Sequence, residues 1–263
     1  MSATPETPPA AFLTQLFGLS GKRVLVTGAS RGIGRALAIG CARAGAELIV
    51  TARRRDALDE TIAAIDATGA RATPLPFDQR DIAATEAALT ALSAPVDVLI
   101  NNAGIEEVRP ATEIDEALWD RIVDTNLKGA FFVARTVARG MLARGAGAII
   151  NLASLTSFVG VGTAVPYSAS KSGVLGMTRA LAAEWAPSGL RVNAIAPGYF
   201  RTGLTDVFYQ DPAWVDAMTA KVPMGRLGDL DDLVGAALFL GSDAARYVNG
   251  QCIVIDGGYL STL

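Results

Sequence analysis

The 263-residue chain contains no histidine. This absence excludes Ser-His-Asp triads, histidine general bases and zinc sites built on imidazole. Any acid–base chemistry must therefore fall to Tyr, Lys, Asp or Glu side chains. We expect no metal site.

Cysteine is almost absent as well, since only Cys41 and Cys252 are present. Both lie inside apolar patterns, so we expect them to fill core space and to form no disulfide. A reduced, cytoplasmic setting fits this usage.

Excess charge and long apolar runs are the other two absences. The net charge is −3 and the only basic run is Arg53–Arg55. The sequence therefore lacks the basic patch that binds nucleic acid. No apolar run approaches the roughly 18 residues that a membrane span needs, and the N-terminus lacks the basic start and apolar stretch of a signal peptide. We expect a flexible N-terminal tail at residues 1–18 and one domain at residues 19–263.

Short apolar, β-branched runs alternate with helical patterns along the domain. A long amphipathic helix is expected over residues 114–143. A further helical segment is expected at Thr202–Lys221, where it would form a mobile lid over a pocket. This alternation predicts the α/β class, with a doubly wound, Rossmann-type parallel sheet of about seven strands. The expected strands are Lys22–Thr27, Glu47–Thr51, Ala72–Phe77, Val96–Ile100, Ala148–Ala153, Arg191–Ala196 and Cys252–Ile255.

A glycine-rich turn lies between the first strand and the first helix of the domain, with the sequence GASRGIG at residues 28–34. Glycines let the backbone turn sharply and approach a pyrophosphate, whose charge meets the free N–H groups at the helix start. The arrangement predicts a dinucleotide site.

The residues after the second strand bear on which dinucleotide binds. A binder of NAD would carry an acidic residue here for the ribose 2′-hydroxyl. The chain instead has Arg53 and Arg54, with Arg31 in the glycine turn, and guanidinium groups suit a 2′-phosphate. We predict NADP(H) in preference to NAD(H); the alternative is that these arginines only solvate the start of the next helix.

Several candidate residues directly follow predicted strands, and ligands of open α/β sheets bind at that edge. Asn101 is expected to be structural, and Ala103-Gly104 leaves room for a ligand. Asp78 either contacts an adenine edge or caps the following helix. The residues at strand ends are Gly28, Arg53, Asp78, Asn102, Ser154 and Pro197.

Tyr167 and Lys171 are four residues apart on a predicted helix and so share one face. A neighbouring ammonium favours phenolate, so we expect the pKa of Tyr167 to lie below the ordinary value of about 10. An exposed helix pair without a role is the alternative. Asn126 lies inside the long helix, where an amide either holds a group such as a water or is a tolerated polar residue facing solvent.

Together these residues resemble the short-chain dehydrogenase/reductase family, over nearly the whole chain from about Leu19. The motifs are TGASRGIG at 27–34, NNAG at 101–104, YSASK at 167–171 and PGYFRT at 197–202, with Asn126 and Ser154. The start LFGLSGK, the PGYFRT segment and the end GGYLSTL look most like the gluconate 5-dehydrogenase or sugar-acid branch, with 3-oxoacyl-carrier-protein reductases next.

The resemblance implies a catalytic tetrad that reduces a carbonyl or oxidises an alcohol. Tyr167 would be the acid–base group and Ser154 would hydrogen-bond the substrate oxygen. Lys171 would hold the nicotinamide ribose and keep the pKa of Tyr167 low, and Asn126 would anchor a water in a proton relay. The cofactor would be bound by Gly28, Ser30, Arg31, Gly32, Ile33, Gly34, Arg53, Arg54, Asp78, Gln79, Asn102, Ala103, Gly104, Tyr167, Lys171, Pro197, Gly198 and Thr202.

The substrate is predicted to be a keto-sugar acid or another small carbonyl compound, and a homotetramer is expected. The alternatives are a 3-oxoacyl thioester reductase and, as a non-enzyme, a dinucleotide-sensing scaffold. No nucleic-acid or membrane partner is expected. The candidate substrate wall consists of Glu106, Leu155, Val161, Tyr199 and Phe200.

Overall fold

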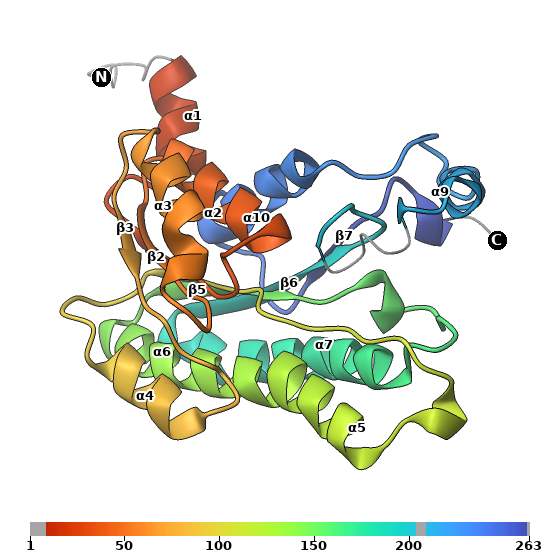
Figure 1. Cartoon of the computed structure of the whole chain (residues 1–263). Helices are drawn as coiled ribbons and strands as arrows, with labels where there is room; N and C mark the ends of the chain where they lie inside the picture. Colours follow the sequence, from red (N-terminus) through yellow and green to blue (C-terminus); the bar gives the residue numbers. More distant parts are fainter. Residues whose placement is uncertain (1–8, 204–208, 262–263) are drawn as a thin grey trace, which may run out of the picture.

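The computed structural model describes residues 9–203 and 209–261, which form one parallel sheet with helices on both faces (Figure 1). The strand order is β3-β2-β1-β4-β5-β6-β7. The predicted α/β class and the doubly wound seven-stranded sheet are confirmed. The strands are β1 (Arg23–Val26), β2 (Glu47–Val50), β3 (Ala72–Pro74), β4 (Val98–Asn101), β5 (Gly147–Leu152), β6 (Leu190–Pro197) and β7 (Cys252–Ile255).

The helices form two layers. Helices α2, α3 and α10 cover one face of the sheet, and α4, α6 and α7 cover the other, with α5 beside α7 (Figure 1). The α-helices are α1 (Pro9–Phe17), α2 (Gly32–Arg43), α3 (Asp59–Asp66), α4 (Ile82–Thr90), α5 (Glu116–Val123), α6 (Ala130–Arg144), α7 (Val165–Trp185), α9 (Pro212–Thr219) and α10 (Val234–Gly241). Short 3₁₀ turns include η4 (Leu155–Ser157) and η6 (Leu230–Leu233).

The strands are apolar throughout because both faces of the sheet are buried. Successive side chains of a strand point to opposite faces. Accordingly Val24 and Val26 pack in the core cluster that contains Leu37 of α2, whereas Leu25 packs in the cluster that contains Met141 of α6. Cys41 is buried in the first cluster, and both cysteines are free, as predicted.

The centre of the sheet is the point at which the strand order reverses. β1 pairs with β2 on one side and with β4 on the other. Ligands of open α/β sheets bind outside the carboxyl ends of the strands at such a switch point. The fold therefore places the end of β1, with its glycine turn, beside the end of β4, with Asn101–Gly104.

The single helix expected over residues 114–143 is present as an unbroken helical segment from Glu116 to Arg144, but its middle is not α-helical. α5 and α6 are joined by a π-helical turn, η3 (Asp124–Gly129), which contains Asn126. A π turn displaces backbone carbonyls from their usual partners. One of them, Thr125 O, accepts a hydrogen bond of 2.5 Å from Nε2 of Gln79. Hydrophobic periodicity does not reveal such a turn, because the extra residue barely changes the apolar stripe.

Helix α1 occupies Pro9–Phe17, within the segment expected to be a flexible tail. The flexible tail and the domain boundary at residue 19 stay predictions. Phe17 lies against Phe239 of α10, with ring centroids 6.5 Å apart. No helix within residues 9–203 and 209–261 is long and apolar enough to cross a membrane.

Candidate active site

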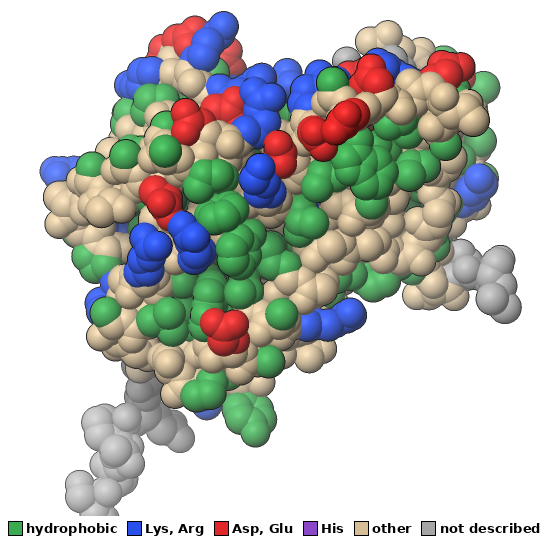
Figure 2. All heavy atoms as spheres, turned by 90° about the horizontal axis from the view of Figure 1, so that it is seen from below, with side chains coloured by type: hydrophobic (Ala, Val, Ile, Leu, Met, Phe, Trp, Pro, Cys, Tyr) green, Lys and Arg blue, Asp and Glu red, His purple; other side chains and the backbone are tan. Residues whose placement is uncertain are grey.

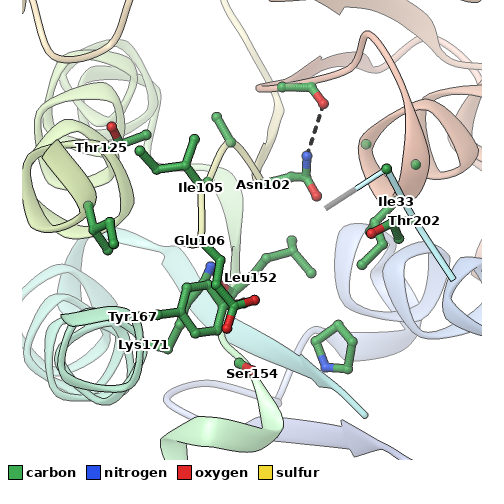
Figure 3. A pocket seen from close by; sticks show the side chains of 18 of the residues that line it. Ile33, Asn102, Ile105, Glu106, Thr125, Leu152, Ser154, Tyr167, Lys171 and Thr202 are labelled. Carbon is green, nitrogen blue, oxygen red and sulfur yellow. Dashed lines mark hydrogen bonds between the residues drawn. The ribbon is translucent and has the colours of Figure 1, made fainter. Parts of the chain in front are cut away.

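A cavity of about 800 Å³ opens at the carboxyl edge of the sheet (Figure 3). It is lined by every predicted site residue except Arg54 and Asn126. We call the part around Gly28–Gly34 and Arg53 the phosphate end. We call the part around Ser154, Tyr167 and Lys171 the catalytic end.

The glycine turn of the phosphate end packs so closely against its neighbours that side chains do not fit at two of its glycines. A Cβ on Gly28 would lie 2.8 Å from the Cα of Ala103, and one on Gly34 would lie 2.3 Å from the carbonyl oxygen of Gly28. Arg31 is the N-cap residue of α2, and its side chain accepts no hydrogen bond from the helix. The first backbone N–H groups of α2 are therefore not capped by this side chain. This cradle fits the pyrophosphate of a dinucleotide.

The turn is held in place by three side chains to which the sequence assigned no role of their own. Thr61 Oγ1 donates to the carbonyl of Ala29 at 2.8 Å, and Arg35 Nε donates to that of Ser30 at 3.1 Å. Thr27 Oγ1 accepts hydrogen bonds from the backbone N–H groups of Asn102 and Ala103, both at 2.9 Å. These bonds fix the turn before any ligand binds. Thr27 lies within the motif and Arg35 directly follows it, so both gave an available sequence signal, whereas Thr61 comes from α3 and gave none.

Of the three arginines predicted to select NADP, two line the cavity. Arg31 and Arg53 form no ion pair within 4 Å among the described residues, and both are exposed. Arg54 lies outside the lining and pairs with Asp56, with 76% of its side chain exposed. The structure therefore brings Arg31 and Arg53 to the phosphate end and leaves Arg54 on the surface.

Asp78 lines the cavity, and the alternative that it caps a helix is wrong. The cap of α4 is Asp81, which accepts a hydrogen bond of 3.0 Å from the N–H of Ala84. Asp78 instead pairs with Arg80 at 2.7 Å, and this hydrogen-bonded partner lowers the pKa of the carboxyl group.

The two asparagines after β4 have different partners. Asn101 is structural, as predicted, because its Nδ2 donates to the carbonyl of Ala130 at 2.7 Å and to Asn151 at 3.2 Å. Asn102 reaches back to the glycine turn, where its Nδ2 donates to the carbonyl of Thr27 at 2.9 Å and to that of Gly28 at 3.2 Å. Asn102 therefore joins the end of β4 to the end of β1 (Figure 3).

At the catalytic end, Tyr167 and Lys171 lie on one face of α7, as predicted. Lys171 Nζ lies 5.7 Å from the centre of the Tyr167 ring and donates to the carbonyl of Leu152 at 2.6 Å. Burial lowers the pKa of Lys171 to about 8, with the Glu106 carboxylate acting in the opposite direction. Only 5% of this lysine is exposed, so the alternative of an exposed surface pair is wrong.

The expectation of a lowered pKa for Tyr167 is also wrong. Burial is the largest cause and raises the pKa, and the Glu106 carboxylate raises it further. A hydrogen bond with Ser154 lowers it by less than these two raise it. The sequence showed the ammonium four residues away but could not show the carboxylate that faces the phenol from another segment.

Ser154 is placed by the turn that follows β5. Its Oγ accepts from the N–H of Thr156 at 3.2 Å, and its own N–H donates to Ser157 Oγ at 3.3 Å. This reciprocal cap of η4 holds Ser154 beside Tyr167.

Asn126 is buried, with 1% of the residue exposed, so the reading of it as a solvent-facing residue is wrong. Its Oδ1 accepts from the N–H of Ile105 and its Nδ2 donates to the carbonyl of the same residue, both at 2.8 Å. The second Nδ2 hydrogen is directed to Ser170 Oγ at 3.1 Å. The amide thus holds the protein backbone next to the cavity, with both Nδ2 hydrogens used, while Oδ1 accepts one hydrogen bond and keeps a second lone pair. The water that Asn126 is expected to anchor stays a prediction.

The predicted substrate wall comes together in the cavity, with further residues that the sequence analysis did not propose. The Tyr199 ring meets Trp214 edge-on at 5.7 Å between centroids. Residues 204–208 of the expected lid lie outside the described residues, and α9 occupies the part at Pro212–Thr219. The lining residues not proposed from sequence include Arg80, Arg121, Thr125, Thr156, Thr163 and Trp214.

Comparisons with known proteins cover nearly the whole chain. A family model described as enoyl-(acyl carrier protein) reductase matches residues 28–260. The gluconate 5-dehydrogenase of Gluconobacter oxydans (strain 621H) is 42% identical over 251 residues, which cover 94% of this chain and 98% of that protein.

Solved structures agree. A putative short-chain alcohol dehydrogenase from Sinorhizobium meliloti 1021 is 56% identical with a TM-score of 0.90, covering 94% of this chain and 100% of that one. A gluconate 5-dehydrogenase from Burkholderia cenocepacia J2315, in complex with NADP and tartrate, is 39% identical with a TM-score of 0.92, covering 95% of this chain and 99% of that one.

Proposed function

Because the chain belongs to the short-chain dehydrogenase/reductase family, we propose that it interconverts a ketone and a secondary alcohol with NADP(H), using Tyr167 as the acid–base group. The observation that carries this proposal is the grouping of Ser154, Tyr167 and Lys171 at one end of a cavity whose other end holds the glycine turn, Arg31 and Arg53.

NADPH bound along this cavity supplies the hydride for reduction. Tyr167 donates its phenolic proton to the carbonyl oxygen as that oxygen becomes a hydroxyl group. The phenol of Tyr167 is protonated at neutral pH and so carries the proton to be donated, but burial raises its pKa and makes it a weaker acid, so the phenolate that forms needs a neighbouring positive charge. Ser154 donates a hydrogen bond to the same oxygen and so favours the negative charge that develops on it.

Lys171 stabilises the phenolate that is left after the proton has moved. Its pKa of about 8 leaves it mostly protonated at pH 7, so a positive charge lies near the Tyr167 ring during the step. Asn126 acts one step away, because it fixes the backbone at Ile105 beside the reacting groups. Gln79 in turn holds the π turn that carries Asn126.

The cofactor is NADP(H) in this proposal. Arg31 and Arg53 are free of ion pairs within the described residues and can meet the 2′-phosphate at the phosphate end. The NADP complex of the Burkholderia cenocepacia relative supports the same assignment.

We assign the substrate to the keto-sugar acids and closely related polyhydroxy ketones. Similarity to a gluconate 5-dehydrogenase along almost the full length of both chains supports this class. No feature of the cavity favours a 3-oxoacyl thioester, and all four members of the family's catalytic tetrad are present, which disfavours a cofactor-sensing scaffold.

The test is a spectrophotometric panel of 5-keto-D-gluconate, a β-ketoacyl thioester and cyclic ketones, each with NADPH and with NADH. NADPH oxidation with the keto-sugar acid that is lost in Tyr167→Phe would support the proposal. Equal turnover by Tyr167→Phe would overturn the mechanism, and turnover of only the thioester would overturn the substrate class.

We also propose a cytoplasmic homotetramer. Figure 2 shows hydrophobic side chains gathered on the face seen from below, which α4, α5, α6 and α7 form. Trp119 of α5 and Val165 of α7 are 39% and 43% exposed. Exposed apolar surface of this kind is typical of subunit interfaces. A monomeric mass by light scattering would contradict the assembly.

A further inference from the structure

Glu106 differs from the other acidic residues of the cavity. Asp78 pairs with Arg80, and Glu107 pairs with Arg109 and Arg121. Within residues 9–203 and 209–261, the Glu106 carboxylate has no ion pair within 4 Å and accepts no hydrogen bond, yet it lines the cavity. The carboxylate is therefore available to a ligand, and a ligand that displaces water from it without donating a hydrogen bond would leave it unsatisfied.

The position of Glu106 puts it against the reacting groups. Its charge acts on Tyr167, Lys171 and Tyr199, which come from α7 and from the segment after β6. Figure 3 shows its side chain reaching from the segment after β4 towards Tyr167, Lys171 and Ser154. A substrate whose carbonyl oxygen meets Ser154 and Tyr167 therefore has the atoms next to that carbonyl beside Glu106.

The backbone that carries Glu106 is fixed on both sides. Asn126 holds the N–H and the carbonyl of Ile105, the preceding residue. Three residues after Glu106, the N–H of Arg109 donates to the carbonyl of Thr163 at 2.8 Å, which ties this segment to the loop before α7. The carboxylate is thus presented by a rigid segment, as a group that selects substrates must be.

The chemistry of a carboxylate limits what it can select. An ionised carboxylate only accepts hydrogen bonds, so its partner must be a donor. A hydroxyl group on the carbon next to the carbonyl supplies one, whereas a carboxylate or phosphate there would be repelled and a methylene would leave Glu106 unsatisfied.

We propose that Glu106 is a specificity-determining residue that accepts a hydrogen bond from a hydroxyl group on the carbon adjacent to the reacting carbonyl, so that the enzyme selects α-hydroxy ketones and vicinal diols. This inference rests on the proposed function and deepens it. In a 5-keto hexonate, the carbons on both sides of the carbonyl bear hydroxyls and the acid group is distant, so such a substrate meets the requirement.

The experiment compares 2-hydroxycyclohexanone with cyclohexanone, which differ by one hydroxyl group. For each ketone kcat/KM is measured with NADPH in the wild-type protein, Glu106→Leu and Glu106→Gln. We expect the wild type to favour the hydroxyketone by about 10- to 100-fold, the value of a hydrogen bond to a charged group. Glu106→Leu should bring the ratio towards one, and Glu106→Gln, which can still accept a hydrogen bond, should give an intermediate ratio.

Glu107→Gln is the matched control for the ratio, because its carboxylate is adjacent in sequence but is already held by Arg109 and Arg121. A second readout needs no turnover. With NADPH bound, the dissociation constants of trans-cyclohexane-1,2-diol and cyclohexanol are measured by calorimetry, and Glu106→Leu should weaken only the preference for the diol.

The outcomes separate the two proposals. Tyr167-dependent turnover of both ketones with an unchanged ratio in Glu106→Leu would overturn the role of Glu106 and leave the proposed function standing. A parallel loss on both ketones would also overturn it, since Glu106 would then act through Tyr167 and Lys171. Absence of Tyr167-dependent turnover with either ketone and with the keto-sugar acid would overturn both proposals.

Discussion

The two ends of the cavity handle charge in opposite ways. At the phosphate end, Arg31 and Arg53 are exposed side chains on turns that follow β1 and β2. At the catalytic end, Lys171 is buried on a long helix, and an acidic side chain from a distant segment faces it. At the catalytic end, burial shifts the pKa values of Tyr167 and Lys171.

The difference follows from the tasks of the two ends. A phosphate group needs permanent positive charge that remains hydrated until the ligand arrives, which guanidinium groups on turns provide. Proton transfer needs groups whose affinity for a proton is tuned, and only a buried site can tune it strongly.

Tyr167→Phe should produce the largest effect. Removing the proton donor should lower kcat by about 1000-fold, within the range usual for general acid–base groups. Binding of NADPH, measured by fluorescence titration, should persist because the phosphate end is untouched. Tyr247→Phe is the control, because Tyr247 is fully exposed outside the cavity. A comparable loss in both variants would remove Tyr167 from its assigned role.

Arg53→Ala should disturb the phosphate end alone. We expect the dissociation constant of NADPH to rise by about tenfold or more, while that of NADH changes little, because only NADPH carries the 2′-phosphate. Arg54→Ala is the matched control, since Arg54 pairs with Asp56 outside the cavity lining. If both cofactors weaken equally in Arg53→Ala, Arg53 does not contact the 2′-phosphate.

Gln79→Ala tests the hydrogen bond that holds the π turn between the two ends of the cavity. The variant removes the donor to Thr125 O, a buried bond of 2.5 Å, and should lower the free energy of unfolding by about 2 kcal/mol, because an unpaired buried carbonyl is costly. Urea unfolding measures the change. Gln251→Ala, at an exposed position, should change it by less than about 0.5 kcal/mol. Equal stability of the two variants would show that the π turn does not need Gln79.

The smallest effect concerns the pH dependence of stability at the catalytic end. Burial lowers the pKa of Lys171 from 10.5 to about 8. Between these two pH values the unfolded chain binds more protons at Lys171 than the folded protein does. The free energy of unfolding therefore rises with pH in this range, by at most about 1.4 kcal/mol per pH unit. This contribution is lost as the pH falls through 8.

Lys171→Met removes that contribution. Urea unfolding of both proteins between pH 8 and about 10, below the ordinary pKa of tyrosine, should show a steeper rise for the wild type. Parallel curves would show that Lys171 keeps its ordinary pKa in the folded protein, and that the two ends do not differ in the way described here.

The sequence by itself determined the layers, the strand number and the phosphate end. Apolar runs such as VLV in β1 require burial on both sides, and a glycine turn between a strand and a helix has few physical uses. The pairing of Tyr167 with Lys171 was also readable, because helix geometry alone brings residues four apart together.

Only the tertiary structure decided the pKa shifts at the catalytic end and the contacts of the π turn next to it. Sequence spacing predicted a lowered pKa for Tyr167, but burial and Glu106, 61 residues before it in the chain, raise it. Likewise the π turn that contains Asn126 accepts a hydrogen bond from Gln79, which lies in the segment after β3. Desolvation and contacts between segments distant in sequence have no local pattern, and they set the properties of the groups that react.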